Sequence, residues 1–313
     1  MTREIRKDLD KAKGLYGAKK YREAFEIYNK HFLESPNKFD YWNKVRYCWC
    51  MYYLFIKDAS DETELFEHAE IVTDTVKQVD LNNAPVCVYT QCVFSVIMFL
   101  KSRQDWGYML YWLDKLDPKL LSDRDKKSKD SKYPSKKEDY YRYLSAALIK
   151  SGDYEECIET SKEALDVIND FAFNGDVWHK WRIGKSLNML GQPQEALEYL
   201  NDVAQSQNDW YILKEIADCH YKIGDYENAM DYASKAVLAD GKANLKVNLY
   251  LLIYNILKDS NPDLALKHAK LYLAIKLESG AAVAEEIDDL NIDEGAMDIE
   301  SLEIEIRNYW LNN

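Results

Sequence analysis

The stretch SGDYEECIETSKEAL, residues 151–165, decides the fold because the chain repeats its pattern. The pattern returns as LGQPQEALEYLNDVA at residues 190–204 and as IGDYENAMDYASKAV at residues 223–237. Looser copies are AKKYREAFEIYNKHF at residues 18–32 and DSNPDLALKHAKLYL at residues 259–273. A phrase that recurs in this way indicates a stacked array of small structural units.

Each clear copy is centred on a glycine, and Gly152, Gly191 and Gly224 are spaced by 39 and 33 residues. Glycine can close a helix by taking the left-handed conformation, and Asp153 and Asp225 follow as N-caps of the next helix, with Glu156 placed for a capping box. Small residues lie seven positions before and five after each glycine: Ser145, Cys157, Gly184, Ala196, Ala217 and Ala229. Larger side chains there would push two crossing helices apart. The spacing therefore predicts consecutive helix pairs.

These residues resemble the tetratricopeptide repeat family. The match is clear over residues 138–279, with four consecutive units, and over residues 5–38, with one. Residues 39–118 keep the length of helix pairs, so we interpret them as divergent repeats, with a non-repeat helical insert as the alternative. The resemblance implies an all-α fold: a right-handed helical-repeat solenoid of about seven helix pairs plus a C-terminal capping helix.

Composition predicts four regions: an N-terminal repeat array at 1–120, a Lys-rich linker at 121–137, a C-terminal array at 138–280, and an acidic linker with a C-terminal helix at 281–313. Residues 122–139 hold seven Lys or Arg against five acidic residues, which favours an exposed connection, with a docking patch for an acidic partner as the alternative. Residues 284–306 hold ten acidic residues and no basic one. This acidic tail is interpreted as part of a cap, an occupant of the chain's own groove, or a ligand of another subunit.

Composition also limits the class of protein. The 313 residues carry a net charge of −13, which disfavours general nucleic-acid binding, and no apolar run is long enough to span a membrane. No secretory signal is apparent at residues 1–14, so a cytoplasmic protein is expected. The six cysteines lie among apolar residues without metal-ligand spacing, which predicts buried, reduced thiols and neither a metal site nor a cofactor.

By the resemblance, the first helix of each pair lines a concave groove where ligands bind. The groove positions on which a partner is expected are Arg142, Trp178, Trp181, Arg182, Lys185, Asn188, Tyr211, Lys214, Tyr221, Tyr250 and Tyr254. This set is basic and aromatic although the whole chain is acidic. Arg and Lys bind carboxylates, and Tyr and Trp offer flat contact area. For any single Tyr, packing between neighbouring helices is the alternative.

These features predict a non-catalytic scaffold or adaptor that binds a partner's peptide, of acidic character, in the basic aromatic groove. No phosphate-binding loop, nucleophile elbow or metalloprotease motif occurs, so the chain is not expected to be an enzyme. The alternative is a single-stranded nucleic-acid-binding accessory subunit of a larger assembly of the prokaryotic defence type, in which aromatic rings stack on bases.

Overall fold

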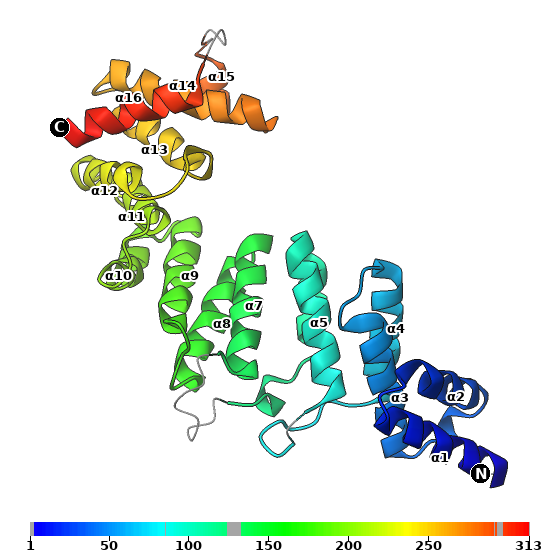
Figure 1. The fold of residues 1–313 in the computed structure, drawn as a ribbon. Coiled ribbons are helices and arrows are strands. Elements are labelled where there is room, and N and C mark those ends of the chain that lie inside the picture. The colour runs from blue at the N-terminus through cyan, green and yellow to red at the C-terminus, as the bar shows by residue number, and fades with distance from the viewer. Residues whose placement is uncertain (1–2, 85, 124–132, 291, 293–296, 313) are drawn as a thin grey trace. The chain divides into compact units, whose positions relative to one another are not determined.

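The computed structural model describes residues 3–84, 86–123, 133–290, 292 and 297–312, and within them every regular element is a helix (Figure 1). Seven helix pairs follow one another: α1 (Arg3–Gly17) and α2 (Tyr21–Glu34), α3 (Tyr41–Met51) and α4 (Glu62–Thr75), α5 (Val88–Arg103) and α6 (Trp106–Asp114), α7 (Lys136–Ser151) and α8 (Tyr154–Val167), α9 (Gly175–Met189) and α10 (Pro193–Ala204), α11 (Trp210–Lys222) and α12 (Tyr226–Leu238), α13 (Val247–Leu257) and α14 (Pro262–Ser279). The short α15 (Glu285–Asp288) and α16 (Ile299–Asn312) end the chain. The predicted all-α fold of consecutive helix pairs is confirmed.

Short turns complete the pairs. The 3₁₀ turns are η1 (Pro36–Lys38), η3 (Pro118–Leu120) and η4 (Ala243–Leu245), and a π-helical turn, η2 (Tyr52–Ile56), extends α3. Residues 39–118, whose repeats are divergent in sequence, form the helix pairs α3–α4 and α5–α6. Among the described residues, none of the helices combines the length and the apolar character that a membrane crossing requires.

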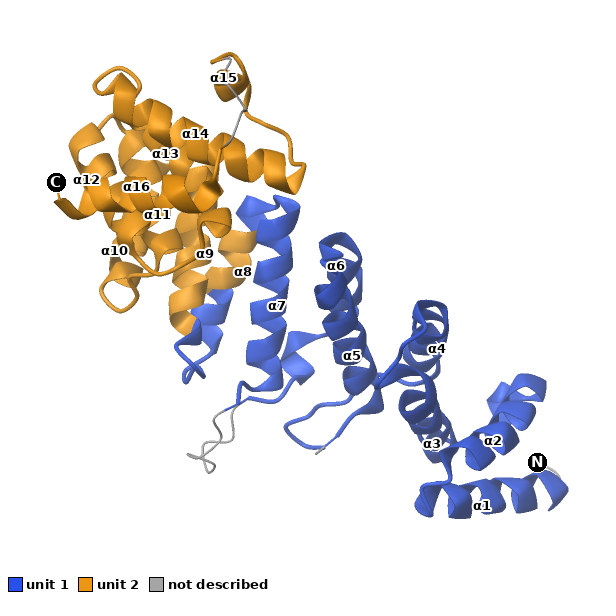
Figure 2. Ribbon diagram, turned by 45° about the horizontal axis from the view of Figure 1, so that its top comes forward, with its two compact units in different colours: residues 1–156, 163–175 blue, residues 157–162, 176–313 orange. Residues whose placement is uncertain are grey.

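The chain divides into two compact units (Figure 2). Unit 1 comprises residues 1–156 and 163–175, and unit 2 comprises residues 157–162 and 176–313, so α8 contributes to both. The predicted linker 121–137 falls in the first of these units, and its residues 124–132 lie outside the described residues. A boundary between two arrays at this linker stays a prediction.

The helix ends form as the glycines predict. Gly152, Gly191 and Gly224 have φ angles of 87°, 76° and 80°, the left-handed conformation that only glycine adopts without strain. At the start of α12, the side chain of Asp225 accepts a hydrogen bond from the backbone N–H of Asn228 at 3.2 Å.

The expected side-chain cap at Asp153 is wrong, because no cap hydrogen bond forms there although the residue holds the N-cap position of α8. The side chain of Asn228 also donates to Asp225, at 2.7 Å, and holds that carboxylate over the helix end. Glu156 occupies the corresponding position of α8, where a capping-box Glu would accept from the backbone N–H of Asp153, but that N–H donates to the carbonyl of Leu148 at 3.0 Å instead. The predicted capping box therefore does not form.

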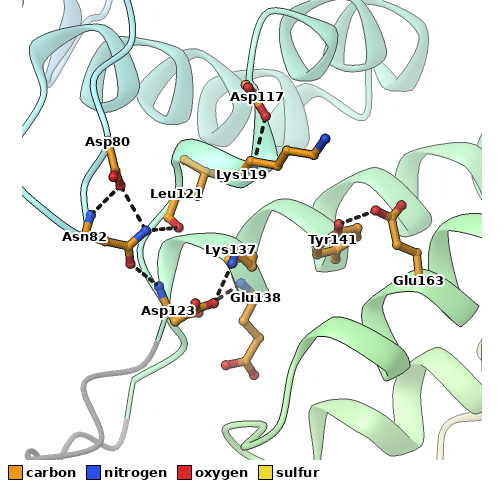
Figure 3. A network of polar contacts seen from close by, with 11 residues as sticks. Asp80, Asn82, Asp117, Lys119, Leu121, Asp123, Lys137, Glu138, Tyr141 and Glu163 are labelled. Carbon is orange, nitrogen blue, oxygen red and sulfur yellow. Dashed lines mark hydrogen bonds and ion pairs between the residues drawn. The ribbon is translucent and has the colours of Figure 1, made fainter.

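Unit 1 is held together at one edge by its loops (Figure 3). The backbone N–H of Leu81, after α4, donates to the carbonyl of Leu120, after α6, at 2.9 Å. The side chain of Asn82 donates to Asp80 at 3.0 Å and accepts from the backbone N–H of Asp123 at 3.3 Å. These contacts give hydrogen-bond partners to polar groups of the two loops. They also hold the ends of two successive helix pairs beside each other.

Unit 2 ends in a helix that covers the array, which confirms the predicted capping helix. Helix α16 packs on α12 and α14, with Ile306 fully buried. The guanidinium of Arg307 donates to the carbonyls of Val237 and Leu238 at 2.9 and 3.0 Å. The buried ammonium of Lys246 also donates to the Val237 carbonyl, at 3.0 Å. Two cations therefore satisfy the free carbonyls at the C-terminus of α12.

Candidate functional site

Ten of the eleven predicted partner-binding residues lie in unit 2, on α9, α11 and α13, whereas Arg142 lies on α7 in unit 1. The residues of α9 and α11 come together on a common surface. We call this the α9–α11 surface, and its members are Trp178, Trp181, Arg182, Lys185, Asn188, Tyr211, Lys214, Tyr221 and Lys222. On α9, Trp181 and Arg182 follow Trp178 by three and four residues, and Lys185 follows them by four and three, so these side chains share one side of the helix.

The aromatic part of the α9–α11 surface is a cluster of three rings from two helices. Trp178 stacks on Tyr211 with ring centroids 6.1 Å apart, and Trp181 meets Tyr211 edge to face at 5.9 Å. All three rings are half-buried, so each keeps part of its surface open to solvent. Burial, together with the neighbouring charge of Asp209 and a hydrogen bond to it, raises the pKa of Tyr211 to about 12, so the phenol stays protonated at neutral pH. The cluster is a neutral, rigid contact area.

The charged part of the surface is neutralised more than its sequence suggests. Lys185 and Lys214 lie 3.3 and 3.4 Å from the same carboxylate oxygen of Glu215, whose side chain is 5% exposed. The ammonium of Lys185 also lies over the ring of Trp181, 5.1 Å from its centroid. Two cations around one buried carboxylate leave a local excess of one positive charge beside the aromatic cluster.

A second polar group lies one turn further along. Asn188, 1% exposed, donates to the carboxylate of Asp218 at 2.7 Å and accepts from the ammonium of Lys222 at 2.9 Å. Lys222 and Asp218 form an ion pair at 3.1 Å. Asn188 therefore joins α9 to α11 as a buried structural bridge, and only the ends of Lys222 and Asp218 remain accessible to a ligand.

Besides the buried Asn188, two predicted residues belong to the hydrophobic core and not to the surface. Tyr250 is 1% and Tyr254 is 8% exposed, and both pack in the hydrophobic core of unit 2. Burial raises the pKa of Tyr250, as expected for a phenol removed from water. This corrects their assignment to the groove, because in this conformation a partner cannot reach Tyr250 at all. Their packing between helices was the stated alternative.

Arg142 has its own partners in unit 1. Its guanidinium pairs with Asp139 at 2.5 Å, donates to the hydroxyl of Tyr143 at 2.9 Å, and lies over the ring of Tyr143 at 4.7 Å. Lys101 approaches the same ring at 5.2 Å. Arg142 is thus part of a cation–aromatic cluster within unit 1, and it is described apart from the α9–α11 surface.

The residue that the sequence analysis missed is Glu215. It follows Lys214 directly, and spacing alone gave no sign that its carboxylate would point between two lysines. Asp218 and Lys222 were detectable, since acid and base four residues apart on a helix regularly pair. A carboxylate that is buried in a groove helix indicates that cations lie nearby, because a buried charge is costly unless it is paired.

The remaining titratable groups do not add chemistry to the surface. Burial, with a smaller effect of the Arg182 charge, lowers the pKa of His179 to about 3, so the imidazole is neutral near pH 7. All six cysteines are free and buried, as predicted, and burial raises the pKa of Cys219 to about 12. In the described part of the chain, no group of three or more His, Cys, Asp or Glu residues is arranged to hold a metal ion.

Comparison with known proteins gives similarities of fold. No model of a protein family and no curated protein matches the sequence. Among solved structures, MamA from Desulfovibrio magneticus is 15% identical, covers 61% of this chain and 97% of its own, and has a TM-score of 0.44. A Rap protein in complex with competence and sporulation factor is 12% identical, with 98% and 87% covered and a TM-score of 0.48. A tetratricopeptide repeat protein from Parabacteroides merdae is 12% identical, with 99% and 100% covered and a TM-score of 0.40, so the chain is similar in architecture to proteins built from these repeats.

Proposed function

We propose that the chain is a non-catalytic scaffold that binds a segment of another protein on the α9–α11 surface. The observation that carries the proposal is the half-buried cluster of Trp178, Trp181 and Tyr211 with Lys185 over one of its rings. Rigid aromatic rings beside a cation are typical of sites that carry most of the binding energy in protein interfaces.

The proposed ligand is a peptide with carboxylate groups. Arg182, Lys185, Lys214 and Lys222 outnumber the carboxylates of Glu215 and Asp218, so an acidic peptide gains attraction. Because Glu215 already occupies two lysines, this attraction is smaller than the basic residues alone would give. The aromatic cluster is therefore expected to supply most of the affinity, and the cations the preference for acidic sequences.

Selection of peptides from a random display library by the full chain tests this function. Enriched peptides should carry Asp, Glu or a free C-terminal carboxylate near an apolar residue. Titration of one enriched peptide should show a loss of about tenfold or more for Trp181→Ala, as for other interface anchors. Glu215→Gln keeps the size of the side chain and releases the two lysines, so it should tighten binding of an acidic peptide several-fold.

The matched control is Lys235→Ala, which removes an exposed lysine that pairs with Asp231 four residues away on α12. This change should leave peptide affinity unchanged. If Trp181→Ala binds as well as the original chain, or if Glu215→Gln weakens an acidic peptide, the α9–α11 surface is not the site.

A further inference from the structure

Positive charge is concentrated at the start of the chain. Residues 1–57, which end with the π-helical turn after α3, hold 13 Lys or Arg against 7 Asp or Glu, whereas the remaining residues hold 28 against 47. The acidic balance of the whole chain therefore hides a basic segment with a net charge of +6. Asp58, Asp61 and Glu62 follow this segment directly, whereas acidic residues farther away than a Debye length of about 8 Å are largely screened at physiological salt.

Helix α3 and the π-helical turn that follows it carry a stripe of aromatic and basic side chains. Trp42, Arg46, Trp49 and Tyr53 follow at intervals of four, three and four residues, which places them on one side of the helix. Trp42 is 64% and Tyr53 is 40% exposed, although large aromatic side chains usually seek burial. Lys57, at the end of the same turn, is exposed as well.

Two rings of this stripe, Trp49 and Tyr53, belong to a ladder of rings that extends to the preceding pair of helices, whereas Trp42 contacts the ring of Tyr41. Tyr53 stacks on Trp49 at 5.6 Å and on Tyr21 of α2 at 4.3 Å, and Tyr16 of α1 lies 5.8 Å from Tyr21. Tyr53 lies inside the π-helical turn, which the hydrogen bond from the Lys57 N–H to the Tyr52 carbonyl closes at 2.9 Å. Such turns interrupt a helix at an energetic cost and are frequent at functional sites.

The basic side chains of the stripe, Arg46 and Lys57, are not neutralised by ion pairs with other described residues. Within the described residues, neither Arg46 nor Lys57 forms a salt bridge, whereas Lys20 pairs with Glu23 at 3.3 Å between exposed side chains. The Arg46 guanidinium lies 3.5 Å from the side-chain oxygen of Asn43 and also interacts with the hydroxyl of the buried Tyr28. This differs from the α9–α11 surface, where a buried carboxylate holds the lysines.

We propose that this surface, formed by Trp42, Arg46, Trp49, Tyr53, Lys57 and Tyr21, binds single-stranded nucleic acid. A single strand presents flat bases and regularly spaced phosphates, and it therefore uses both the exposed rings and the unpaired cations. An acidic peptide presents no regular series of flat rings for the aromatic side chains to stack on, and a duplex hides the faces of its bases. The inference is independent of the proposed peptide-binding function, since it concerns unit 1 and other residues.

Fluorescence anisotropy of the full chain with labelled single-stranded DNA and RNA of random sequence tests the proposal. Both oligonucleotides should bind, with affinity falling linearly in a plot of log affinity against log salt. Trp42→Ala should weaken binding roughly tenfold, in the range of one stacked base. Lys57→Glu should lower the salt slope by about one, as expected for a phosphate contact. Both side chains are exposed, so neither change should unfold the chain, which circular dichroism will verify.

Matched controls are Tyr226→Ala, an equally exposed aromatic residue of unit 2, and Lys150→Glu, an exposed lysine of α7. Neither should change the affinity, and Trp181→Ala of the peptide surface should have no effect either. The proposal is overturned if neither oligonucleotide binds, if the controls weaken binding as much as Trp42→Ala, or if a duplex binds equally well. Equal competition by poly-glutamate would assign the surface to acidic polypeptides instead.

Discussion

The indole N–H of Trp310 donates a hydrogen bond to Nε2 of His268 at 3.1 Å and thereby ties the last helix to α14. Because Nε2 accepts, the imidazole is neutral and carries its proton on Nδ1, which donates to the carbonyl of Leu264 at 2.9 Å. His268 is fully buried, and burial is the main reason that its pKa is lowered to about 4. The cap formed by α16 thus depends on a neutral histidine.

Acidification should therefore destabilise unit 2. A histidine whose pKa is lower in the folded than in the unfolded chain stabilises the fold fully above the unfolded value of about 6.5, and this stability is lost as the pH falls toward 4. In that window the free energy of unfolding should fall by about 1.4 kcal/mol per pH unit for one such histidine. Urea unfolding at pH 7, 6 and 5, followed by circular dichroism, measures the slope.

His268→Gln should reduce the slope of the free energy of unfolding against pH by the contribution of one titrating group, because the variant has no imidazole to protonate at this position. His179, whose pKa is lowered to about 3, acts in the same direction, so part of the pH dependence should remain in the variant. A slope identical to that of the original chain would show that His268 is not the group that titrates.

Arg307→Ala should release the C-terminal helix. The substitution leaves the Leu238 carbonyl without its donor, whereas the Val237 carbonyl keeps Lys246. Hydrogen bonds to charged groups contribute about 1.5–3 kcal/mol, so a loss of about 2 kcal/mol in the free energy of unfolding is expected. Hydrogen exchange should become faster in α16 and in the last turn of α12.

The matched control lies in the same interface. Lys267 pairs with Glu305 at 2.6 Å, but both side chains are about half exposed. Exposed ion pairs contribute little, so Lys267→Ala should lower the free energy of unfolding far less than Arg307→Ala does. Equal effects of the two substitutions would contradict the assigned role of Arg307.

Gly184→Ala should destabilise the crossing of α9 and α10. An added Cβ would lie 2.7 Å from Cγ of Leu200 and 3.2 Å from the carbonyl oxygen of Ala196. Overpacking of this kind costs about 1–3 kcal/mol, which thermal unfolding measures. Gly14→Ala is the control with the opposite sign: nothing lies within 4 Å of its added Cβ on α1, so it should stabilise the chain by about 0.5–1 kcal/mol. Equal shifts would refute the packing argument.

The sequence predicted the helix boundaries where a glycine ends the first helix of a pair. It did not predict them where another residue takes the same left-handed conformation. Helix α5 ends at Gln104 with φ 58°, and Asp105 then accepts from the backbone N–H of Tyr108 to start α6. Lys19 takes φ 60° between α1 and α2. The helix pair at residues 88–114 therefore uses the same device as Gly224 and Asp225, but a search for the glycine does not find it.

The candidate site was only partly predictable for a different reason. Helical spacing identifies residues on one side of α9 or α11, but it does not show which of them later elements cover. Tyr250 shares the groove spacing of Tyr211, yet it contacts the ring of His268 at 6.3 Å within the core. Likewise, the pairing of Lys185 with Glu215 depends on the separation between two helices, which the order of residues does not specify.

Asn188→Ala provides a test of the bridge between α9 and α11. The change removes the donor to Asp218 and the side-chain acceptor for Lys222 at a position that is 1% exposed. Unsatisfied buried polar groups cost about 1–3 kcal/mol, so urea unfolding should show a loss of that size and hydrogen exchange should quicken in α11. The control is Asn228→Ala, whose side chain bonds to Asp225 at the surface and should cost less than about 1 kcal/mol. If the two asparagines prove equivalent, water replaces the bridge at no cost, and the arrangement of Lys222 and Asp218 on the α9–α11 surface does not depend on Asn188.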